Sequence, residues 1–213
     1  MTSTRSYGQA CSVAHALDMV GERWSLLIVR ELLLGPKRFT DLRAGIPTVS
    51  PNVLSQRLRE LEGVDVVRNR RLGPPTSAWV YELTDWGREL DAVLIQLGRW
   101  GRRSPHRKPA GDASTDALML AMRCRFRPDS ARGLDAEYAV RLDDDDFGIK
   151  ITDGRLEVGR STPSAPTATM ETDRRTFAGL MTGNQRVDVA SAAGEVRLDG
   201  DTDAVDRLFE AVA

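Results

Sequence analysis

The chain has 213 residues, of which 41% are hydrophobic and 29% are charged, as in an ordinary soluble globular protein. This composition excludes a disordered or collagen-like chain, and apolar runs such as residues 26–29 and 32–34 are far too short to span a membrane. The net charge of −1 conceals a division, because residues 1–110 hold 17 Lys and Arg against 11 Asp and Glu, whereas residues 111–213 hold 13 against 20. The basic first half is the part suited to an anionic partner.

The segment 102–112 marks a boundary between two domains. It contains two prolines, a glycine and a cluster of basic side chains, and it lacks apolar periodicity. We therefore expect an N-terminal domain over residues 1–102, a linker over 103–112 and a C-terminal domain over 113–213. The start of the chain lacks the apolar core of a signal peptide, which predicts a cytoplasmic protein.

The N-terminal domain is predicted to begin with a series of helices. Apolar residues at helical spacing indicate three of them, at 12–20, 23–34 and 39–44. Pro47 excludes a helix across the following loop. Ser50 then offers an N-cap hydroxyl and Pro51 suits the first helical position, so a further helix is expected through residue 62.

This last helix is predicted to have two different faces. Its apolar stripe consists of Leu54, Leu58 and Leu61. The opposite face carries amide and guanidinium groups, which suit base edges and phosphates, and the first residues of a recognition helix are those that reach the major groove. The residues expected to contact DNA are therefore Ser50, Asn52, Val53, Gln56 and Arg57. For this helix alone, a solvated surface face is the alternative explanation.

A β-hairpin is predicted next, from two β-rich runs at 66–72 and 79–83 that are joined by a turn rich in proline. Its first arm carries Arg68, Arg70 and Arg71, which suit the phosphates of a DNA backbone. We interpret this hairpin as the wing of a winged helix-turn-helix domain. The alternative is a solvated edge hairpin whose charges prevent strand pairing with other chains.

Several motifs occur in order along residues 11–100. They are the run 11–33, Phe39-Thr-Asp-Leu42, Ile46-Pro47, the run 50–62 and Tyr81-Glu-Leu-Thr84. Together they resemble the HxlR-type (MarR-like) winged-helix transcription regulators. The resemblance implies a bacterial regulator that binds a palindromic operator of double-stranded DNA as a homodimer. Asp65 stands where that family usually has glycine, and since Asp tolerates a left-handed helix cap we expect only a small stability cost.

A final helix of this domain is expected from Asp85, which can act as its N-cap. Its apolar stripe includes Trp86 and Trp100 and the four residues expected to form a dimer contact, namely Leu90, Val93, Leu94 and Leu97. The alternative is that the stripe packs on its own domain. A two-fold dimer would set two recognition helices about 34 Å apart, one turn of DNA, which predicts an inverted-repeat site.

Cys11 lies where proteins of the resembled family often carry a cysteine, and the resemblance implies a thiol sensor in some of them. A position at the start of a helix lowers the pKa of a thiol and favours the reactive thiolate. The alternative is a small buried hydrophobic residue.

The C-terminal domain is predicted to have an α+β fold. Apolar spacing indicates helices at 116–126, 174–181 and 203–212 and strands at 136–142, 147–152, 155–159 and 167–171. Asp153-Gly154 is typical of a tight hairpin turn. The four aspartates at 143–146 lack the glycine and the spaced Glu of a calcium loop, so we expect a solvated turn there.

Part of the segment 168–209 resembles the type-two sterol carrier protein fold, in particular Ala168-Thr-Met-Glu-Thr-Asp173 and Gly194-Glu-Val-Arg-Leu-Asp-Gly-Asp201. The resemblance implies an apolar cavity for a fatty-acyl or other lipophilic ligand. The residues that could line it are Met119, Met122, Phe126, Phe177, Leu180 and Met181, and the alternative is that they form an ordinary core.

No catalytic motif, phosphate loop or metal-ligand spacing is present in the sequence, so we expect neither an enzyme nor a cofactor. The leading hypothesis is a DNA-binding transcriptional regulator that responds to a lipophilic effector in its C-terminal domain. One alternative is a lipid carrier whose helical domain docks to other proteins. Another is a C-terminal domain that serves only for dimerisation.

Overall fold

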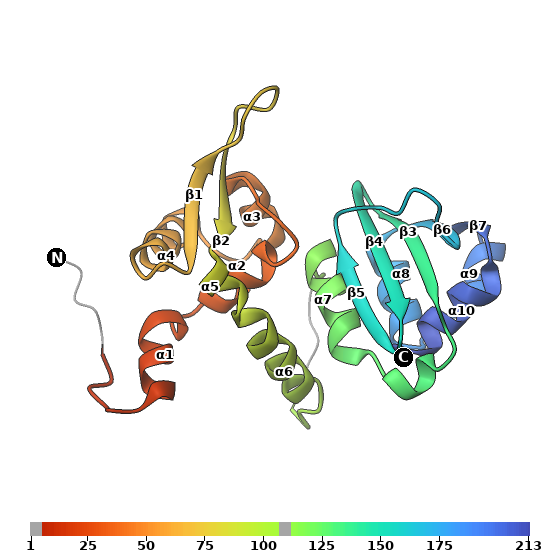
Figure 1. Ribbon diagram of the computed structural model, residues 1–213, viewed down its shortest axis with the longest axis horizontal. Coiled ribbons are helices and arrows are strands. Elements are labelled where there is room, and N and C mark those ends of the chain that lie inside the picture. The colour runs from red at the N-terminus through yellow and green to blue at the C-terminus, as the bar shows by residue number, and fades with distance from the viewer. Residues whose placement is uncertain (1–5, 107–111) are drawn as a thin grey trace. The chain divides into compact units, whose positions relative to one another are not determined.

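The computed structural model describes residues 6–106 and 112–213 (Figure 1). Its contacts divide the chain into two compact units, Met1–Leu94 and Ile95–Ala213. Residues 1–5 and residues 107–111 of the expected linker lie outside the described part of the chain. The expected domain limits therefore stay a prediction, whereas the order of a helical unit followed by an α+β unit is confirmed.

The first unit consists of short helices and one hairpin. Its elements are α1 (Ser12–Val20), α2 (Ser25–Leu32), α3 (Phe39–Gly45), α4 (Pro51–Gly63), β1 (Val67–Arg71), β2 (Trp79–Leu83), α5 (Asp85–Arg88) and the start of α6 (Leu90–Arg102). Figure 1 shows the hairpin of β1 and β2 extending beyond the helices, as expected of a wing. The predicted β-hairpin is therefore confirmed, and it projects from its unit as a wing does.

The core of the first unit lies where the leucine stripe of α4 meets α2. Leu54, Leu58 and Leu61 are at most 1% exposed, and Ile28 and Val29 of α2 are completely buried. Burying large aliphatic side chains stabilises a fold by about 1.5–3 kcal/mol each, so this packing fixes the orientation of α4. The predicted division of that helix into an apolar and a polar face is confirmed.

Asp65 ends α4 in the left-handed conformation that its position demands. Its φ is 56°, and the N–H of Val66 donates to the carbonyl of Leu61 while the N–H of Asp65 donates to that of Glu62. This is the Schellman pattern of helix termination, in which glycine usually occupies the left-handed position. Asp serves there at the modest cost expected from the sequence.

Some predicted helix boundaries in this unit differ from the structure. Helix α2 starts at Ser25 because Trp24 has a left-handed φ of 83°. Asp85 is not the N-cap expected of it, since the Oγ1 of Thr84 accepts from the backbone N–H of Gly87 at 2.9 Å. The long helix expected to follow is interrupted at Glu89, which separates α5 from α6.

The second unit is a five-stranded sheet with helices. Its elements are α7 (Thr115–Arg125), the 3-10 turn η1 (Pro128–Ala131), β3 (Ala136–Leu142), β4 (Asp145–Thr152), β5 (Arg155–Gly159), β6 (Ala168–Thr172), α8 (Arg174–Met181), α9 (Val187–Ala192), β7 (Val196–Gly200) and α10 (Thr202–Glu210). The strand order is β5-β4-β3-β6-β7, with β3 and β6 parallel and the other pairs antiparallel. Helix α9 and strand β7 were not predicted from the sequence.

The sheet has one buried and one open face. Every second residue of β3 is buried, from Ala136 to Leu142, and Tyr138 donates from its hydroxyl to the carbonyl of Ala204 in α10. Figure 1 shows α8 and α10 behind the sheet. This two-layer arrangement confirms the predicted α+β class.

The turns of this sheet agree only in part with expectation. Asp153 and Gly154 have φ of 50° and 68°, which confirms the tight hairpin between β4 and β5. The solvated turn expected at 143–146 is limited to its first two residues, because Asp145 and Asp146 belong to β4. Asp145 accepts from Thr115 at 2.6 Å and pairs with Arg160, so it is part of the fold and was wrongly predicted as turn.

Candidate nucleic-acid interface

The start of α4 presents polar side chains to solvent. Ser50 is the N-cap, and its Oγ accepts from the N–H of Val53 at 3.4 Å. Asn52 and Gln56 lie one turn apart on the exposed face, while Val53 is half-buried. Within the described part of the chain, no hydrogen bond engages the Asn52 amide. Folding therefore does not explain why an amide stands at this position.

Gln56 has only an exposed local contact. Its Nε2 donates to Oε1 of Glu60 at 3.0 Å, one helical turn further along α4. A hydrogen bond of this kind on a helix surface is worth only a few tenths of a kcal/mol, about 0.2–0.5, and yields to a ligand at little cost. The Gln56 amide is thus available to a partner.

Arg57, which is expected to contact DNA, is engaged within its own fold. Its side chain is 14% exposed, and its guanidinium pairs with Glu60 on the same helix and with Glu22 at 3.4 Å. Glu22 belongs to the connection between α1 and α2, so Arg57 links α4 to another part of the unit. In this structure Arg57 faces its own fold and not the solvent, because it flanks the buried stripe.

The wing divides its arginines between two faces. In the register of the hairpin, Arg68 is opposite Glu82 and Arg71 is opposite Trp79. Because side chains alternate along a strand, Arg68 and Arg70 share one face, and Arg71 lies on the other with the exposed Trp79. All three arginines are expected on one surface, whereas the two-residue period of the strand separates Arg71 from Arg68 and Arg70.

Glu82 is the buried partner of two of these arginines. It is 5% exposed, and it pairs with Nε of Arg68 at 2.7 Å and with Nε of Arg70 at 2.8 Å. Burial raises the pKa of Glu82, but the hydrogen bonds and positive charges of Arg70 and Arg68 outweigh it and hold that pKa below its ordinary value. The carboxylate is therefore ionised at neutral pH.

The expected dimer contact on α6 is largely exposed. Val93 and Leu97 are 52% and 44% exposed, Leu90 is half-buried and Leu94 is buried. Other large apolar side chains are also exposed in this part of the chain, namely Tyr7, Val13, Leu17, Trp86 and Trp100. Apolar exposure on this scale is unusual for a surface with no partner.

Cys11 is exposed at the N-cap of α1, whereas Cys124 is buried. The backbone N–H groups of Ala14 and then Val13, at the start of α1, lower the pKa of the Cys11 thiol. The interpretation of Cys11 as a small buried hydrophobic residue is therefore wrong.

The residues expected to line a lipophilic cavity lie mainly in the core of the second unit. Met119, Met122, Phe177, Leu180 and Met181 are at most 4% exposed, and Phe126 is half-buried. The ring of Phe177 packs edge-on against Phe209 at a centroid distance of 5.6 Å. None of these six residues lines any of the three described pockets.

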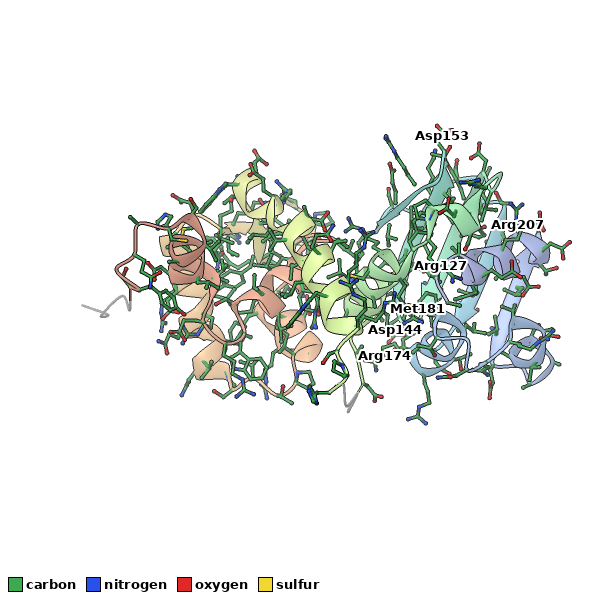
Figure 2. The ribbon with its side chains drawn as sticks, turned by 90° about the horizontal axis from the view of Figure 1, so that it is seen from below. Arg127, Asp144, Asp153, Arg174, Met181 and Arg207 are labelled. Atoms are coloured by element: carbon green, nitrogen blue, oxygen red, sulfur yellow. The ribbon has the colours of Figure 1, made fainter. Side chains whose placement is uncertain are left out.

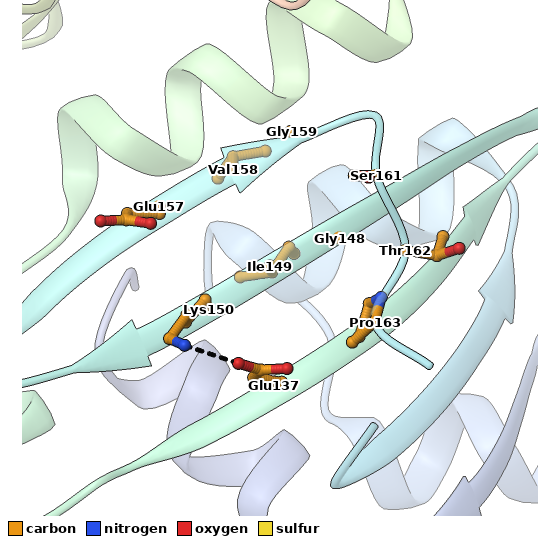
Figure 3. A pocket seen from close by; sticks show the side chains of 10 residues that line it. All are labelled: Glu137, Gly148, Ile149, Lys150, Glu157, Val158, Gly159, Ser161, Thr162 and Pro163. Carbon is orange, nitrogen blue, oxygen red and sulfur yellow. Dashed lines mark hydrogen bonds and ion pairs between the residues drawn. The ribbon is translucent and has the colours of Figure 1, made fainter. Parts of the chain in front are cut away.

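One described pocket, of about 370 Å³, lies on the open face of the sheet (Figure 3). Lys150 and Glu137 form an ion pair of 2.7 Å across it, and Gly148 allows the backbone at Ser161 to pass closely above the strand. At one end of the same unit Arg174 binds Asp143, and Figure 2 shows Arg174 near Asp144 there. An open surface pocket crossed by an ion pair does not suit a lipophilic ligand, which a binding site normally encloses.

Comparisons with known proteins match the two units separately. The family described as HxlR-like helix-turn-helix matches residues 19–109, and the family described as alkyl sulfatase C-terminal matches residues 110–213. The uncharacterised HTH-type transcriptional regulator YvaP of Bacillus subtilis is 42% identical over 86 residues, which are 40% of this chain and 79% of that protein. The HTH-type transcriptional regulator YodB of the same organism is 36% identical over 85 residues, 40% of this chain and 76% of that protein.

A solved structure also resembles part of the chain. The reduced form of the transcriptional regulator YodB from Bacillus subtilis is 31% identical, with a TM-score of 0.42, and the match covers 47% of this chain and 100% of that one. No helix in residues 6–106 or 112–213 is long and apolar enough to cross a membrane. By the extent and identity of its match to YvaP, the chain belongs to the HxlR-like helix-turn-helix family of DNA-binding transcriptional regulators.

Proposed function

We propose that this chain binds an inverted-repeat operator as a homodimer, with α4 in the major groove and the wing on the adjacent backbone. The observation that carries this proposal is the exposed pair Asn52 and Gln56 at the start of α4, whose opposite face is completely buried. Side-chain amides form bidentate hydrogen bonds with adenine, so two amides one turn apart suit sequence readout. A protein with this function works where the chromosome lies, in the bacterial cytoplasm.

Each candidate residue has a separate role in this proposal. Asn52 and Gln56 contact base edges, and Ser50 and Val53 approach the groove beside them. Arg68, Arg70 and Arg71 of the wing contact phosphates, which gives affinity without sequence preference. Arg57 remains the weakest member of the predicted set, because contact with DNA requires it to leave Glu22 and Glu60.

The homodimer is proposed from the exposed apolar side chains of α6. A second copy of the chain would cover Val93 and Leu97, and a two-fold axis would then set the two copies of α4 about one DNA turn, roughly 34 Å, apart. Val93→Glu should give a monomer by analytical ultracentrifugation and weaken operator binding. Val189→Glu, at an equally exposed apolar position on α9, is the matched control.

Selection of bound duplexes from a random DNA library with the purified full chain tests the proposed function. The expected product is an inverted repeat whose half-sites are centred about 10 base pairs apart. Recovery of single half-sites would contradict the dimer. Recovery of no sequence above background, at a salt concentration where binding is measurable, would contradict sequence-specific binding.

A lipophilic effector is proposed for the second unit. The support is the group of adaptable methionines and phenylalanines between α7, α8 and the sheet, which would have to separate to admit an acyl chain. Operator affinity should change when dodecanoate is added at fixed salt, since an effector acts only by binding one state more tightly. Equal affinity with and without dodecanoate, together with native mass spectra free of bound lipid, would favour a unit that serves only for dimerisation.

Thiol sensing at Cys11 is the second regulatory proposal, and it is favoured by the exposure and lowered pKa of that residue. Diamide should weaken operator binding by the wild type and leave Cys11→Ser unaffected. If both proteins respond alike, Cys11 is not the sensor.

A further inference from the structure

A buried carboxylate at the base of the wing engages two of its arginines. Glu82 is 5% exposed, although four of the five residues of the facing strand β1 are exposed. One carboxylate oxygen accepts from Nε of Arg68, and the other pairs with Nε of Arg70. Both arginines face the carboxylate with Nε, so Glu82 holds the two guanidinium groups in the same way.

Both arginines stay accessible to solvent although Glu82 holds them. Arg68 and Arg70 have side chains that are 58% and 44% exposed. A guanidinium carries five N–H donors in a rigid plane, and only the one on Nε faces Glu82. Among the residues that the structure describes, no hydrogen bond engages the Nη groups of either arginine. Four N–H donors of each arginine therefore stay available to a phosphate.

Arg71 provides an internal comparison. It lies on the opposite face of the hairpin, and its Nε donates to the carbonyl of Ser77 at 3.3 Å within the turn. No carboxylate in the described chain pairs with it. Arg71 is thus a wing arginine of the same type that is not held by Glu82.

Two roles for Glu82 lead to opposite expectations. A carboxylate that only neutralises the wing would oppose DNA binding, since it repels phosphates. A carboxylate that orders two guanidinium planes in the free protein would favour binding, because the side-chain entropy is already lost before DNA arrives. The burial of Glu82 and its contact with both Nε atoms favour the second role, since a simple charge on a hairpin surface has no reason to be buried.

We propose that Glu82 is a positioning residue that orients Arg68 and Arg70 for contact with DNA phosphates. This inference rests on the proposed function, because it concerns the same wing. Its consequence is counter-intuitive: removal of a negative charge from a DNA-binding surface should weaken binding.

The test compares wild type with Glu82→Gln on the duplex that the wild type selects. Gln has the same shape, but its amide nitrogen replaces one of the two acceptor oxygens, so only one arginine can still be held. We expect affinity for this duplex to fall by about 3- to 10-fold, the scale of one net hydrogen bond. Unchanged or tighter binding by Glu82→Gln would overturn the proposal and make Glu82 a neutralising charge.

A double-mutant cycle separates positioning from a general effect on folding. In an Arg68→Ala/Arg70→Ala background, Glu82→Gln should no longer weaken binding, whereas in an Arg71→Ala background its full effect should persist. A merely structural Glu82 would weaken binding equally in both backgrounds, and this result contradicts the proposal. If the wild type itself binds no DNA, the proposed function fails. That outcome differs from one in which the wild type binds DNA and Glu82→Gln has the same effect in both backgrounds, which contradicts only the role of Glu82.

A second variant keeps Glu82 intact in case Glu82→Gln does not fold. Arg68→Lys/Arg70→Lys preserves the charge of the wing, but an ammonium engaged by Glu82 lacks the second set of donors that the guanidinium directs outward. Binding should therefore weaken by a similar factor at unchanged net charge. Equal affinity of the lysine variant and the wild type would show that charge alone matters and would overturn the proposal.

Discussion

The two units arrange their polar side chains in different ways. On the open face of the C-terminal sheet, acids and bases of neighbouring strands pair with one another, as Arg141 does with Asp146 at 2.9 Å and Lys150 with Glu137 at 2.7 Å. At the start of α4 in the first unit, the amides of Asn52 and Gln56 face solvent with at most one weak local contact. A surface whose charges satisfy one another offers little to a polyanion, whereas unengaged donors beside a cationic hairpin offer sites for one.

This difference also bears on the division of the chain into a basic first half and an acidic second half. The acidic residues of the second unit are partly compensated within its own sheet, and we expect the uncompensated excess to repel DNA. In the first unit the only buried acid of the wing is turned inward to two arginines. Contact with DNA is thereby directed to the first unit, and substitutions in the two units should have separable effects.

The largest expected effect concerns the amides of α4. Asn52→Ala/Gln56→Ala should lower affinity for the selected duplex by about 100-fold or more, since each bidentate base contact is worth about 1–3 kcal/mol. Binding to a scrambled duplex should change little, because phosphates dominate it. Fluorescence anisotropy on both duplexes measures this. Arg197→Gln, at an exposed ion pair of the C-terminal sheet, is the control that should leave both affinities unchanged.

A substitution at a helix cap in the second unit should lower stability and leave affinity for DNA unchanged. Asp173 accepts from the N–H groups of Arg175 and Thr176 at 2.7 and 2.8 Å, so Asp173→Ala should destabilise this unit by about 1 kcal/mol without changing affinity for DNA. Thermal unfolding followed by circular dichroism measures the loss. A change in operator affinity at a temperature where the variant is folded would break the separation of the two units.

The same cap predicts a dependence on pH. Hydrogen bonds from Thr176, chiefly from its backbone, lower the pKa of Asp173 below its ordinary value of 3.8. The stability it contributes is therefore present above pH 3.8 and is lost as the pH falls toward the lower pKa of the folded state. Asp173→Asn should flatten this acid limb in a series of urea unfolding curves. An unaltered acid limb would show that other carboxylates cause it.

Arg57 should affect stability more than recognition. Arg57→Gln removes the link between α4 and Glu22, and since Glu22 and Glu60 are partly exposed, we expect a loss of only about 0.5–1 kcal/mol. The ratio of specific to non-specific affinity should stay as in the wild type. A large loss of this ratio would mean that Arg57 leaves its ion pairs and contacts bases, as the sequence pattern suggests.

The smallest expected effect concerns Arg71, the wing arginine that Glu82 does not hold. Arg71→Ala should lower the slope of log affinity against log salt by about 1 in magnitude, the value of a single phosphate contact. Titrations between 50 and 200 mM salt, as about the useful range, would measure it. An unchanged slope would place the DNA-contacting face of the wing on the side of Arg68 and Arg70.

Local signals made much of the first unit predictable. Ser50 and Pro51 mark the start of α4, and the leucine spacing marks its buried face, because both depend only on neighbouring residues. In the second unit, α9 has only six residues and β7 buries only Val196, so neither carries an apolar pattern that repeats often enough to predict it. Their existence depends on contacts with distant strands.

The candidate site was predictable as a set of residues but not as a set of contacts. Exposure of Asn52 and Gln56 follows from the helical period. The burial of Glu82 between Arg68 and Arg70 and the pairing of Arg57 with Glu22 depend on register and on contacts far apart in sequence. An alternating strand pattern does not reveal that two arginines share a carboxylate, because it fixes the face on which each side chain lies but not the side chains that it contacts.

The central claim is that the first unit reads a DNA sequence through the start of α4. Titration of the full chain with the selected duplex and with a scrambled duplex of equal composition, at one fixed salt concentration, tests it most directly. We expect the selected duplex to bind at least about 1,000-fold more tightly, as specific regulators do. Equal affinity for the two duplexes would contradict the claim.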